Sequence, residues 1–200
     1  MSDGQDAGNS GRIACYLVAL GGNVATQGGA PEATLRAAIQ EMSKAGLEVV
    51  RQSRLFRTSS FPDPTDPEYV NACVEIRAAL SPAEVLRRLH HIEAEFGRER
   101  VQRWGQRTLD LDLLAQGDTL LPDGATYALW RDLAPEQRLL RAPDDLILPH
   151  PRLHERSFVL VPLAEIAPEW RHPALGLTVQ EMLDRLPRAD RDSVRPIAPD

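Results

Sequence analysis

The order of strands and helices in the first 115 residues constrains the fold of this chain more than any other feature. Four segments have the length and composition of strands, over residues 14–20, 47–56, 69–78 and 108–115. The first is almost continuously apolar, as expected of a central strand that is buried on both faces. In the third, apolar and polar positions alternate, which is typical of a strand whose two faces meet different surroundings.

Two helices are predicted between these strands, each with its own start and stop signals. Pro31 suits the first turn of a helix and Gly46 suits its end. Ser81 and Glu84 have the spacing of a capping box, and Gly97 suits the end of that second helix. The order strand, helix, strand, strand, helix, strand predicts an α+β fold with a ferredoxin-like β-α-β-β-α-β core. We therefore expect an antiparallel sheet with helices packed on it in three α/β/α layers.

The second half of the chain is predicted to be less regular. Residues 119–145 are irregular, with helical character around 125–140. Short helices are expected over 158–166 and from Thr178 to residue 186, where Thr178 and the glutamate three residues later again suit a cap.

A chain of 200 residues is long enough for one sizeable core, so we expect a single domain over residues 13–186. The polar residues 1–12 are predicted to be a disordered tail without the apolar stretch of a secretion signal. The charged, proline-containing residues 187–200 are predicted to be a loose tail.

Composition narrows the class of protein. With 42% apolar and 26% charged residues, the chain is ordinary for a soluble globular protein, and we expect it in the cytoplasm. No run approaches the roughly 18 apolar residues of a membrane span. A formal net charge of −6 argues against a nucleic-acid or anionic-membrane partner, because phosphate groups select basic surfaces. A G-x-x-x-x-G-K-[ST] phosphate loop is absent, which excludes ordinary P-loop kinases.

The most informative motif is a pair of acids on a predicted strand. Asp110 and Asp112 are two residues apart, so their carboxylates share one face while Leu111 points to the other. Two neighbouring carboxylates repel each other unless a cation lies between them. Mg²⁺ prefers one or two protein carboxylates together with water and substrate phosphates. A solvated face is the alternative interpretation of an isolated acid pair.

The residues just before the acid pair favour the metal interpretation. Arginines lie at positions 98, 100, 103 and 107, and a guanidinium matches phosphate oxygens without losing its charge. A basic segment that leads directly into paired acids is what a metal–polyphosphate site requires. Trp104 lies within this segment, either as a packing anchor or as a ring that stacks on a heterocycle.

Two further positions suggest a small-molecule site. Tyr69 and Asn71 face the same way on their strand, and an aromatic ring beside an amide suits a planar ligand with hydrogen-bonding edges. A structural role for Asn71 is the alternative. His150 lies between two prolines, outside the H-E-x-x-H helical context, which argues against zinc.

Together these residues resemble the 6-hydroxymethyl-7,8-dihydropterin pyrophosphokinase family, and the resemblance covers roughly residues 17–186. RWGQRTLDLD followed by LPHPR is the specific part, and the other matches are individually weak. The matching segments are ALGGN (19–23), FRT (56–58), YVNA (69–72), IE (92–93), RWGQRTLDLD (103–112), LPHPR (148–152) and RSFVLVPLAEIAP (156–168).

The resemblance implies a magnesium-dependent enzyme of folate biosynthesis that transfers diphosphate from ATP to the hydroxymethyl group of the pterin and releases AMP. These two small molecules are the implied partners, and we expect a monomer. Asp110 and Asp112 would hold two Mg²⁺ ions, with Arg98 and Arg107 beside them as catalytic residues. The implied ATP-binding residues are Glu93, Arg98, Arg107, Leu113, Leu146, Ile147, His150 and Arg156.

The resemblance also implies a pterin site in which Tyr69 and Phe158 sandwich the ring and Trp104 closes over it. The implied pterin-binding residues are Gly21, Thr58, Ser59, Phe61, Tyr69, Asn71, Trp104 and Phe158.

This sequence departs from the family pattern at three places. Gly22 stands where the family usually has serine, and Ser59 and Ser60 replace the usual prolines. Residues 119–147 make a longer connection than usual, which we interpret as a surface insertion. The alternative is a lid or partner-binding element that carries Trp130 and Arg138.

Two other functions compete with the family interpretation. A metal-dependent nucleotidyltransferase or phosphohydrolase could use the same acids, but would not form AMP only in the presence of the pterin. A ferredoxin-like regulatory module would bind a small ligand without catalysis, and would need no paired acids beside an arginine-rich segment.

Overall fold

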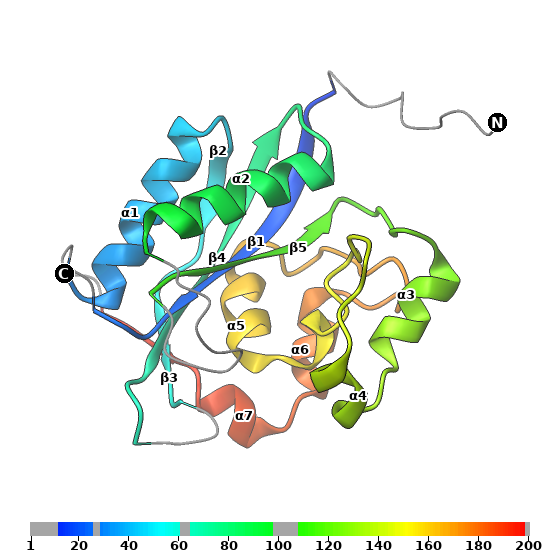
Figure 1. The fold of residues 1–200 in the computed structure, drawn as a ribbon. Helices are drawn as coiled ribbons and strands as arrows, with labels where there is room; N and C mark the ends of the chain where they lie inside the picture. Colours follow the sequence, from blue (N-terminus) through cyan, green and yellow to red (C-terminus); the bar gives the residue numbers. More distant parts are fainter. Residues whose placement is uncertain (1–11, 26–28, 61–64, 98–107, 199–200) are drawn as a thin grey trace.

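The computed structural model describes residues 12–25, 29–60, 65–97 and 108–198; in these ranges, most strands lie before residue 117 and mainly helices follow them (Figure 1). The strands are β1 (Ala14–Gly22), β2 (Glu48–Gln52), β3 (Phe56–Thr58), β4 (Tyr69–Ala78), β5 (Asp110–Gln116) and β6 (Arg195–Pro196). The helices are α1 (Pro31–Lys44), α2 (Pro82–Glu95), α3 (Gly124–Arg131), α4 (Pro135–Leu140), the 3-10 helix η1 (Leu153–Glu155), α5 (Ser157–Ile166), α6 (Val179–Arg185) and α7 (Arg188–Asp192).

The strands form one antiparallel sheet in the order β5-β1-β4-β3-β6, with β2 also paired to β4. Because β1 and β2 both run antiparallel to β4, they are parallel to each other with β4 between them. In the same way, β4 and β5 both run antiparallel to β1, so they are parallel to each other with β1 between them. These two interleaved β-α-β units confirm the predicted ferredoxin-like α+β fold.

Helices cover both faces of the sheet, which confirms the three-layer arrangement (Figure 1). Along β4, alternate residues from Val70 to Ile76 belong to the core cluster that includes residues of α1 and α2. Cys73, on the other face, belongs to a second cluster that includes residues of α5 and α6. The period-two alternation of β4 therefore divides the apolar interior into two layers.

The predicted helix signals act where they were expected. The Ser81 hydroxyl accepts a hydrogen bond from the Glu84 N–H at the start of α2. Thr178 and Glu181 form a complete capping box on α6. Gly46 and Gly97 follow α1 and α2 with φ angles of 75° and 78°, in the left-handed region that favours glycine.

The single strand expected over residues 47–56 is wrong, because the structure has two strands there. Residues 53–55 separate β2 from β3, and the break begins at Ser53. Its N–H donates to the Cys73 carbonyl at 2.9 Å, but its hydroxyl, not its carbonyl, accepts from the Cys73 N–H at 2.9 Å. A side chain that replaces a carbonyl in the ladder interrupts the strand.

The loose tail expected over residues 187–200 is wrong for the described part, 187–198. Here α7 is followed by β6, which pairs with β3. The Ile197 N–H donates to the Leu55 carbonyl at 2.8 Å, and Val194 is only 5% exposed. Short charged segments with proline have little intrinsic structure, so this order comes from pairing with a strand far away in the sequence.

In the described ranges, no helix combines the length and the apolar composition that crossing a bilayer requires.

Candidate active site

The two acids of β5 lie on one face of the sheet, as predicted. Asp110 and Asp112 are half-buried, whereas Leu111 between them is buried in the opposite layer with α1 and α2. Across to β1, Asp112 lies opposite Ala19 and Asp110 lies opposite Gly21. These small neighbours leave space above the sheet beside both carboxylates.

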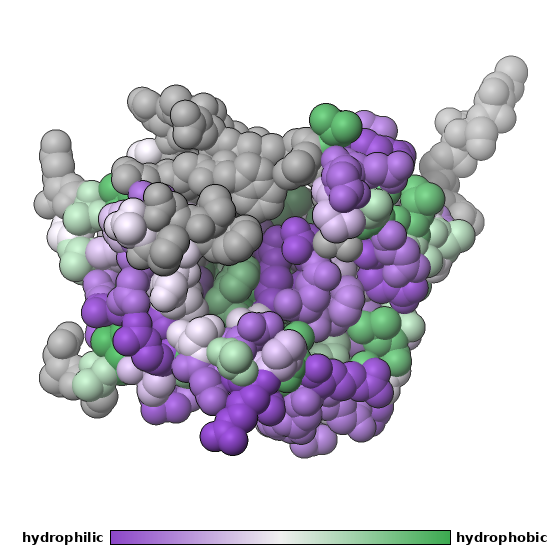
Figure 2. Space-filling model, turned by 90° about the horizontal axis from the view of Figure 1, so that it is seen from below, coloured by the Kyte–Doolittle hydropathy of each residue, from purple (hydrophilic) through white to green (hydrophobic). Residues whose placement is uncertain are grey.

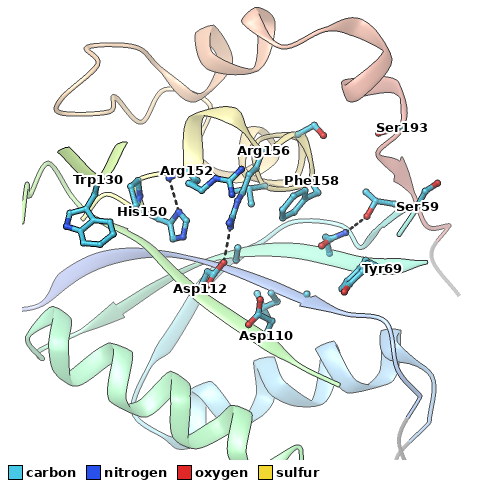
Figure 3. A pocket seen from close by; sticks show the side chains of 18 of the residues that line it. Ser59, Tyr69, Asp110, Asp112, Trp130, His150, Arg152, Arg156, Phe158 and Ser193 are labelled. Atoms are coloured by element: carbon cyan, nitrogen blue, oxygen red, sulfur yellow. Dashed lines mark hydrogen bonds and ion pairs between the residues drawn. The ribbon is translucent and has the colours of Figure 1, made fainter. Parts of the chain in front are cut away.

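A pocket of about 640 Å³ lies between this part of the sheet and the first turn of α5. The end of β3 and Ser193, which follows α7, contribute to its lining. Figure 2 views the molecule from below, the side on which β3 and α7 lie in Figure 1, and shows a hollow near the middle of that face with apolar atoms inside it. In Figure 3 the acids lie in the middle of the pocket, between two ends of different chemistry.

Arg156 brings a cation to the acids from the start of α5. Its Nη1 lies 3.3 Å from Oδ2 of Asp112. Burial lowers the pKa of the guanidinium, and the charge of Asp112 acts in the opposite direction. Because arginine keeps its proton at neutral pH, Arg156 is a partly desolvated positive charge at the pocket wall.

His150 is held in one orientation beside Arg156. Its backbone N–H donates to the Leu114 carbonyl at 2.7 Å, and its Nδ1 accepts from the Arg152 N–H at 3.1 Å. Burial lowers the pKa of His150 to about 4, although Asp112 acts to raise it. The ring is therefore neutral at pH 7. Since Nδ1 is an acceptor, its proton lies on Nε2, where it can be donated to a ligand.

The end of the pocket away from His150 is lined by aromatic side chains and an amide side chain. Phe158 on α5 is 39% exposed, which is unusual for phenylalanine, and it lies across the pocket from Tyr69 of β4 (Figure 3). The Asn71 Nδ2 donates to the Thr58 Oγ1 at 2.9 Å, which orients the amide. Asn71 lies opposite Gly21 on β1, so Asp110, Gly21 and Asn71 form one row across three strands.

Two adjacent glycines at the end of β1 leave room for neighbouring groups, Gly21 for the Asn71 side chain and Gly22 for the backbone of Thr108. A Cβ on Gly21 would lie 3.4 Å from Oδ1 of Asn71 and would cover this acceptor. A Cβ on Gly22 would lie 2.5 Å from the Thr108 carbonyl oxygen, which is too close. Gly22 thus lets the segment before β5 approach the end of β1 directly.

Several residues expected at the site lie elsewhere. Glu93, on α2, is buried, and its Oε1 accepts from the Leu111 N–H at 2.7 Å. Neither Glu93 nor Leu113, Leu146 or Ile147 lines the pocket. Four other expected residues lie outside the described ranges, namely Phe61, Arg98, Trp104 and Arg107.

Sequence reasoning favoured a surface insertion where the structure has one wall of the pocket, and it named Trp130 only in the alternative of a lid or partner-binding element. Residues of the predicted surface insertion, from α3 to the segment after α4, line the end near His150. Ser193, from the supposed tail, lines the other end. Trp130 was the only local signal for this wall, because a tryptophan in a polar surface segment calls for a partner. The wall residues from the insertion are Trp130, Leu133, Arg141 and Pro143.

The acids suit a hard divalent cation that is shared with a substrate. Among the residues of ranges 12–25, 29–60, 65–97 and 108–198, no group of three or more His, Cys, Asp or Glu side chains could hold a metal ion. The two half-buried carboxylates instead provide part of a coordination shell, with the partly buried guanidinium of Arg156 beside them. Mg²⁺ accepts such a site when substrate phosphates and water complete the shell.

Comparisons with known proteins show the family to which the chain is similar. Residues 17–168 match the family model of 7,8-dihydro-6-hydroxymethylpterin-pyrophosphokinase, abbreviated HPPK. A relative from Synechocystis sp., named 2-amino-4-hydroxy-6-hydroxymethyldihydropteridine pyrophosphokinase, is 40% identical over 184 residues, which cover 92% of this chain and 80% of the relative. A relative of the same name from Haemophilus influenzae is 35% identical over 156 residues, or 78% of this chain and 82% of the relative.

Solved structures show the same fold. A Plasmodium falciparum HPPK-DHPS structure with pterin and p-hydroxybenzoate matches 87% of this chain with a TM-score of 0.62 at 13% identity. This chain spans 43% of that longer chain. At such low identity the likeness supports the fold alone.

Proposed function

This chain belongs to the 7,8-dihydro-6-hydroxymethylpterin-pyrophosphokinase family and is a pyrophosphokinase of folate biosynthesis with ATP as co-substrate, and we propose that the pocket between β5 and α5 is its active site. Diphosphate passes from ATP to the hydroxymethyl group of 6-hydroxymethyl-7,8-dihydropterin, and AMP is released. The observation that supports this site most strongly is the acid pair beside Arg156, next to an aromatic and amide end.

The pterin occupies the end with Tyr69 and Phe158 in this proposal. Two aromatic side chains on opposite walls suit a flat heterocycle between them. The bond from Asn71 to Thr58 uses one amide hydrogen, so Oδ1 and the second hydrogen remain to pair with the pterin edge. The absence of a side chain on Gly21 keeps that acceptor uncovered.

The cross-strand row connects pterin binding with the reaction. Asn71 and Asp110 lie two strands apart, or about 10 Å. A pterin whose ring edge pairs with Asn71 can therefore place its hydroxymethyl group beside Asp110. We propose that Asp110 also orients this hydroxyl group.

Asp110 and Asp112 would hold two Mg²⁺ ions together with the ATP phosphates, and the ions would neutralise phosphate charge. Arg156, Arg152 and the Nε2–H of His150 face the phosphates from the opposite wall. Arg98 and Arg107, which lie in the sequence between α2 and β5, would add charge at the transferred group, and Trp104 would cover the substrate. The hydroxymethyl oxygen attacks the β-phosphorus and releases its proton, while the bond between the β-phosphorus and the oxygen of the leaving AMP breaks. Such a transfer depends on positioning and charge neutralisation.

A coupled assay of AMP release tests the proposal. With ATP, Mg²⁺ and 6-hydroxymethyl-7,8-dihydropterin, we expect AMP and the pterin diphosphate in equal amounts. No AMP should form without the pterin or with excess EDTA. Formation of ADP or free phosphate would instead favour a phosphohydrolase. Binding of both ligands without any product would favour a regulatory module.

We further propose that the protein acts as a monomer in the cytoplasm, without a nucleic-acid partner. The net charge of −6 supports the absence of a nucleic-acid partner. Sedimentation of the purified protein with and without substrates tests its oligomeric state, and a dimer in either condition would contradict this part.

A further inference from the structure

The insertion that forms one wall of the pocket is firmly attached to the domain. The backbones of Leu121 and Leu148 exchange two hydrogen bonds, of 2.8 and 3.2 Å. On α3, Tyr127 is only 1% exposed, and its hydroxyl group lies 2.8 Å from Nε2 of the fully buried His172. The Asp123 carboxylate caps α3 by accepting from the N–H groups of residues 125 and 126. A side chain on α3 therefore has a defined position relative to the pocket.

Trp130 lies one helical turn after Tyr127 and lines the pocket. It is half-buried, and the guanidinium carbon of Arg141 lies 5.5 Å from the centre of its ring. Figure 3 shows Trp130 beside His150, at the end of the pocket opposite Tyr69 and Phe158. An indole ring with a guanidinium over it is a flat, cationic platform, and nucleotide bases stack on aromatic and arginine groups of this kind.

The geometry of the reaction indicates which ligand reaches this platform. In an in-line displacement at the β-phosphorus, the attacking and leaving oxygens lie on opposite sides of the phosphorus atom. The proposed pterin end holds the attacking oxygen, and the acids mark the position of the phosphates. The oxygen of the leaving AMP therefore lies on the side away from Tyr69 and Phe158, which is the side of Trp130.

We propose that Trp130, supported by Arg141, stacks on the adenine base of ATP, so that the insertion adds a nucleotide-recognition wall to the site. The inference rests on the proposed function, because the direction of the nucleotide follows from the pterin position. In this proposal Trp130 recognises the base of the nucleotide and does not contact its phosphates.

Calorimetry with the full-length protein and Mg²⁺ tests this role through two ligands that share phosphates but differ in the base. Replacement of Trp130 by alanine should weaken binding of α,β-methylene-ATP about tenfold, the usual loss of one stacked base. Binding of inorganic tripolyphosphate should not change. Trp130→Phe, which keeps an aromatic face, should recover most of the affinity.

Two controls separate stacking from other causes. Arg152→Ala, at the phosphate wall, should weaken both ligands. Trp170→Phe should weaken neither, because the Trp170 Nε1–H donates to the Gly117 carbonyl outside the pocket lining. Thermal unfolding of each variant verifies that the protein measured is folded.

The proposal is overturned if folded Trp130→Ala binds α,β-methylene-ATP like the wild type. It is equally overturned if both ligands are weakened by the same factor, since Trp130 would then only shape the wall. A wild-type protein that binds the nucleotide but releases no AMP would count against the proposed function, and the two failures are thus distinguishable.

Discussion

The two faces of the sheet use the same strands for different purposes. The face toward α1 and α2 is filled by a continuous apolar cluster from Tyr16 to Leu113. The face toward α5 and α6 is apolar at one end only, where Leu17, Cys73 and Leu114 lie. At its other end the side chains become small or polar, and the pocket begins.

This difference shows how a sheet accommodates a reactive site without losing its core. Along β5 the change from Leu111 to Asp112 is a change of face, so the acids do not interrupt the apolar layer behind them. Stability and chemistry should therefore be separable by substitutions at adjacent positions.

The largest expected effects are a loss of activity after substitution of Asp112 and a loss of stability after substitution of Leu111. Asp112→Ala should lower kcat at least about a thousandfold, because charge neutralisation at the phosphates is lost. Its free energy of unfolding should fall by less than about 1 kcal/mol, since the carboxylate is partly exposed. Leu111→Ala should instead cost about 2–5 kcal/mol of stability through a cavity, while the folded fraction keeps its turnover.

Kinetics and urea unfolding of both variants verify this division, with the exposed Asp118→Ala as a control that should change neither quantity. Near-normal turnover of Asp112→Ala would remove the metal site from β5.

The next largest effect is a dependence of stability on pH, and it comes from His172, which holds Tyr127 of the insertion. Burial lowers the pKa of His172 to about 4, while an unfolded histidine titrates near 6.5. The unfolded state therefore binds more protons between these pH values, and stability should fall as pH decreases from about 6.5 to about 4. The contribution of His172 is on the order of 3 kcal/mol. His150 acts in the same direction.

Urea unfolding at a series of pH values between 7 and 4.5 tests this effect. His172→Gln, which cannot titrate, should show a shallower slope than the wild type over this range. An unchanged slope would mean that other groups determine the acid sensitivity.

A smaller effect should follow from Arg156→Lys at the pocket. Lysine keeps the positive charge but loses the planar fork that fits phosphate oxygens. We expect kcat to fall about tenfold. This is less than the roughly 10²–10³-fold loss in kcat that typically follows complete removal of a group that stabilises the transition state. Arg51→Lys, on the exposed part of β2, is the matched control. Equal activities of the Arg156 variant and the wild type would show that this side chain does not touch the phosphates.

The smallest effect should come from removal of residues 195–200, which deletes β6 but keeps Ser193 at the pocket and the buried Val194. β6 pairs with β3, which carries Thr58, and Thr58 orients the Asn71 amide. Without this strand the KM for the pterin should rise severalfold while the KM for ATP stays the same. Steady-state kinetics with each substrate varied in turn test this result, and a change in both constants would indicate general destabilisation.

Much of the sheet and its first two helices could be predicted from sequence because their signals are local. Apolar runs, alternation on β4 and the caps of α2 depend on residues close together in the chain. The position of Asp110 and Asp112 on one face followed from strand periodicity alone.

The rest depends on contacts that a linear pattern does not contain. The break at Ser53 arises because its hydroxyl replaces its own carbonyl opposite Cys73. The order of the C-terminal segment arises from pairing with β3, and Trp130 reaches the pocket because Tyr127 anchors α3 on His172. Such long-range pairings cannot be derived from composition, which favoured a tail and a surface insertion.

The buried hydrogen bond from the Leu111 N–H to Glu93 bears on how this protein resists aggregation at high concentration. In the part of the chain that the structure describes, β5 pairs only with β1 and is an edge strand. Edge strands can recruit strands from other molecules and so start aggregation. By occupying a donor that an incoming strand would need, Glu93 protects the strand that carries both acids from joining a neighbouring sheet.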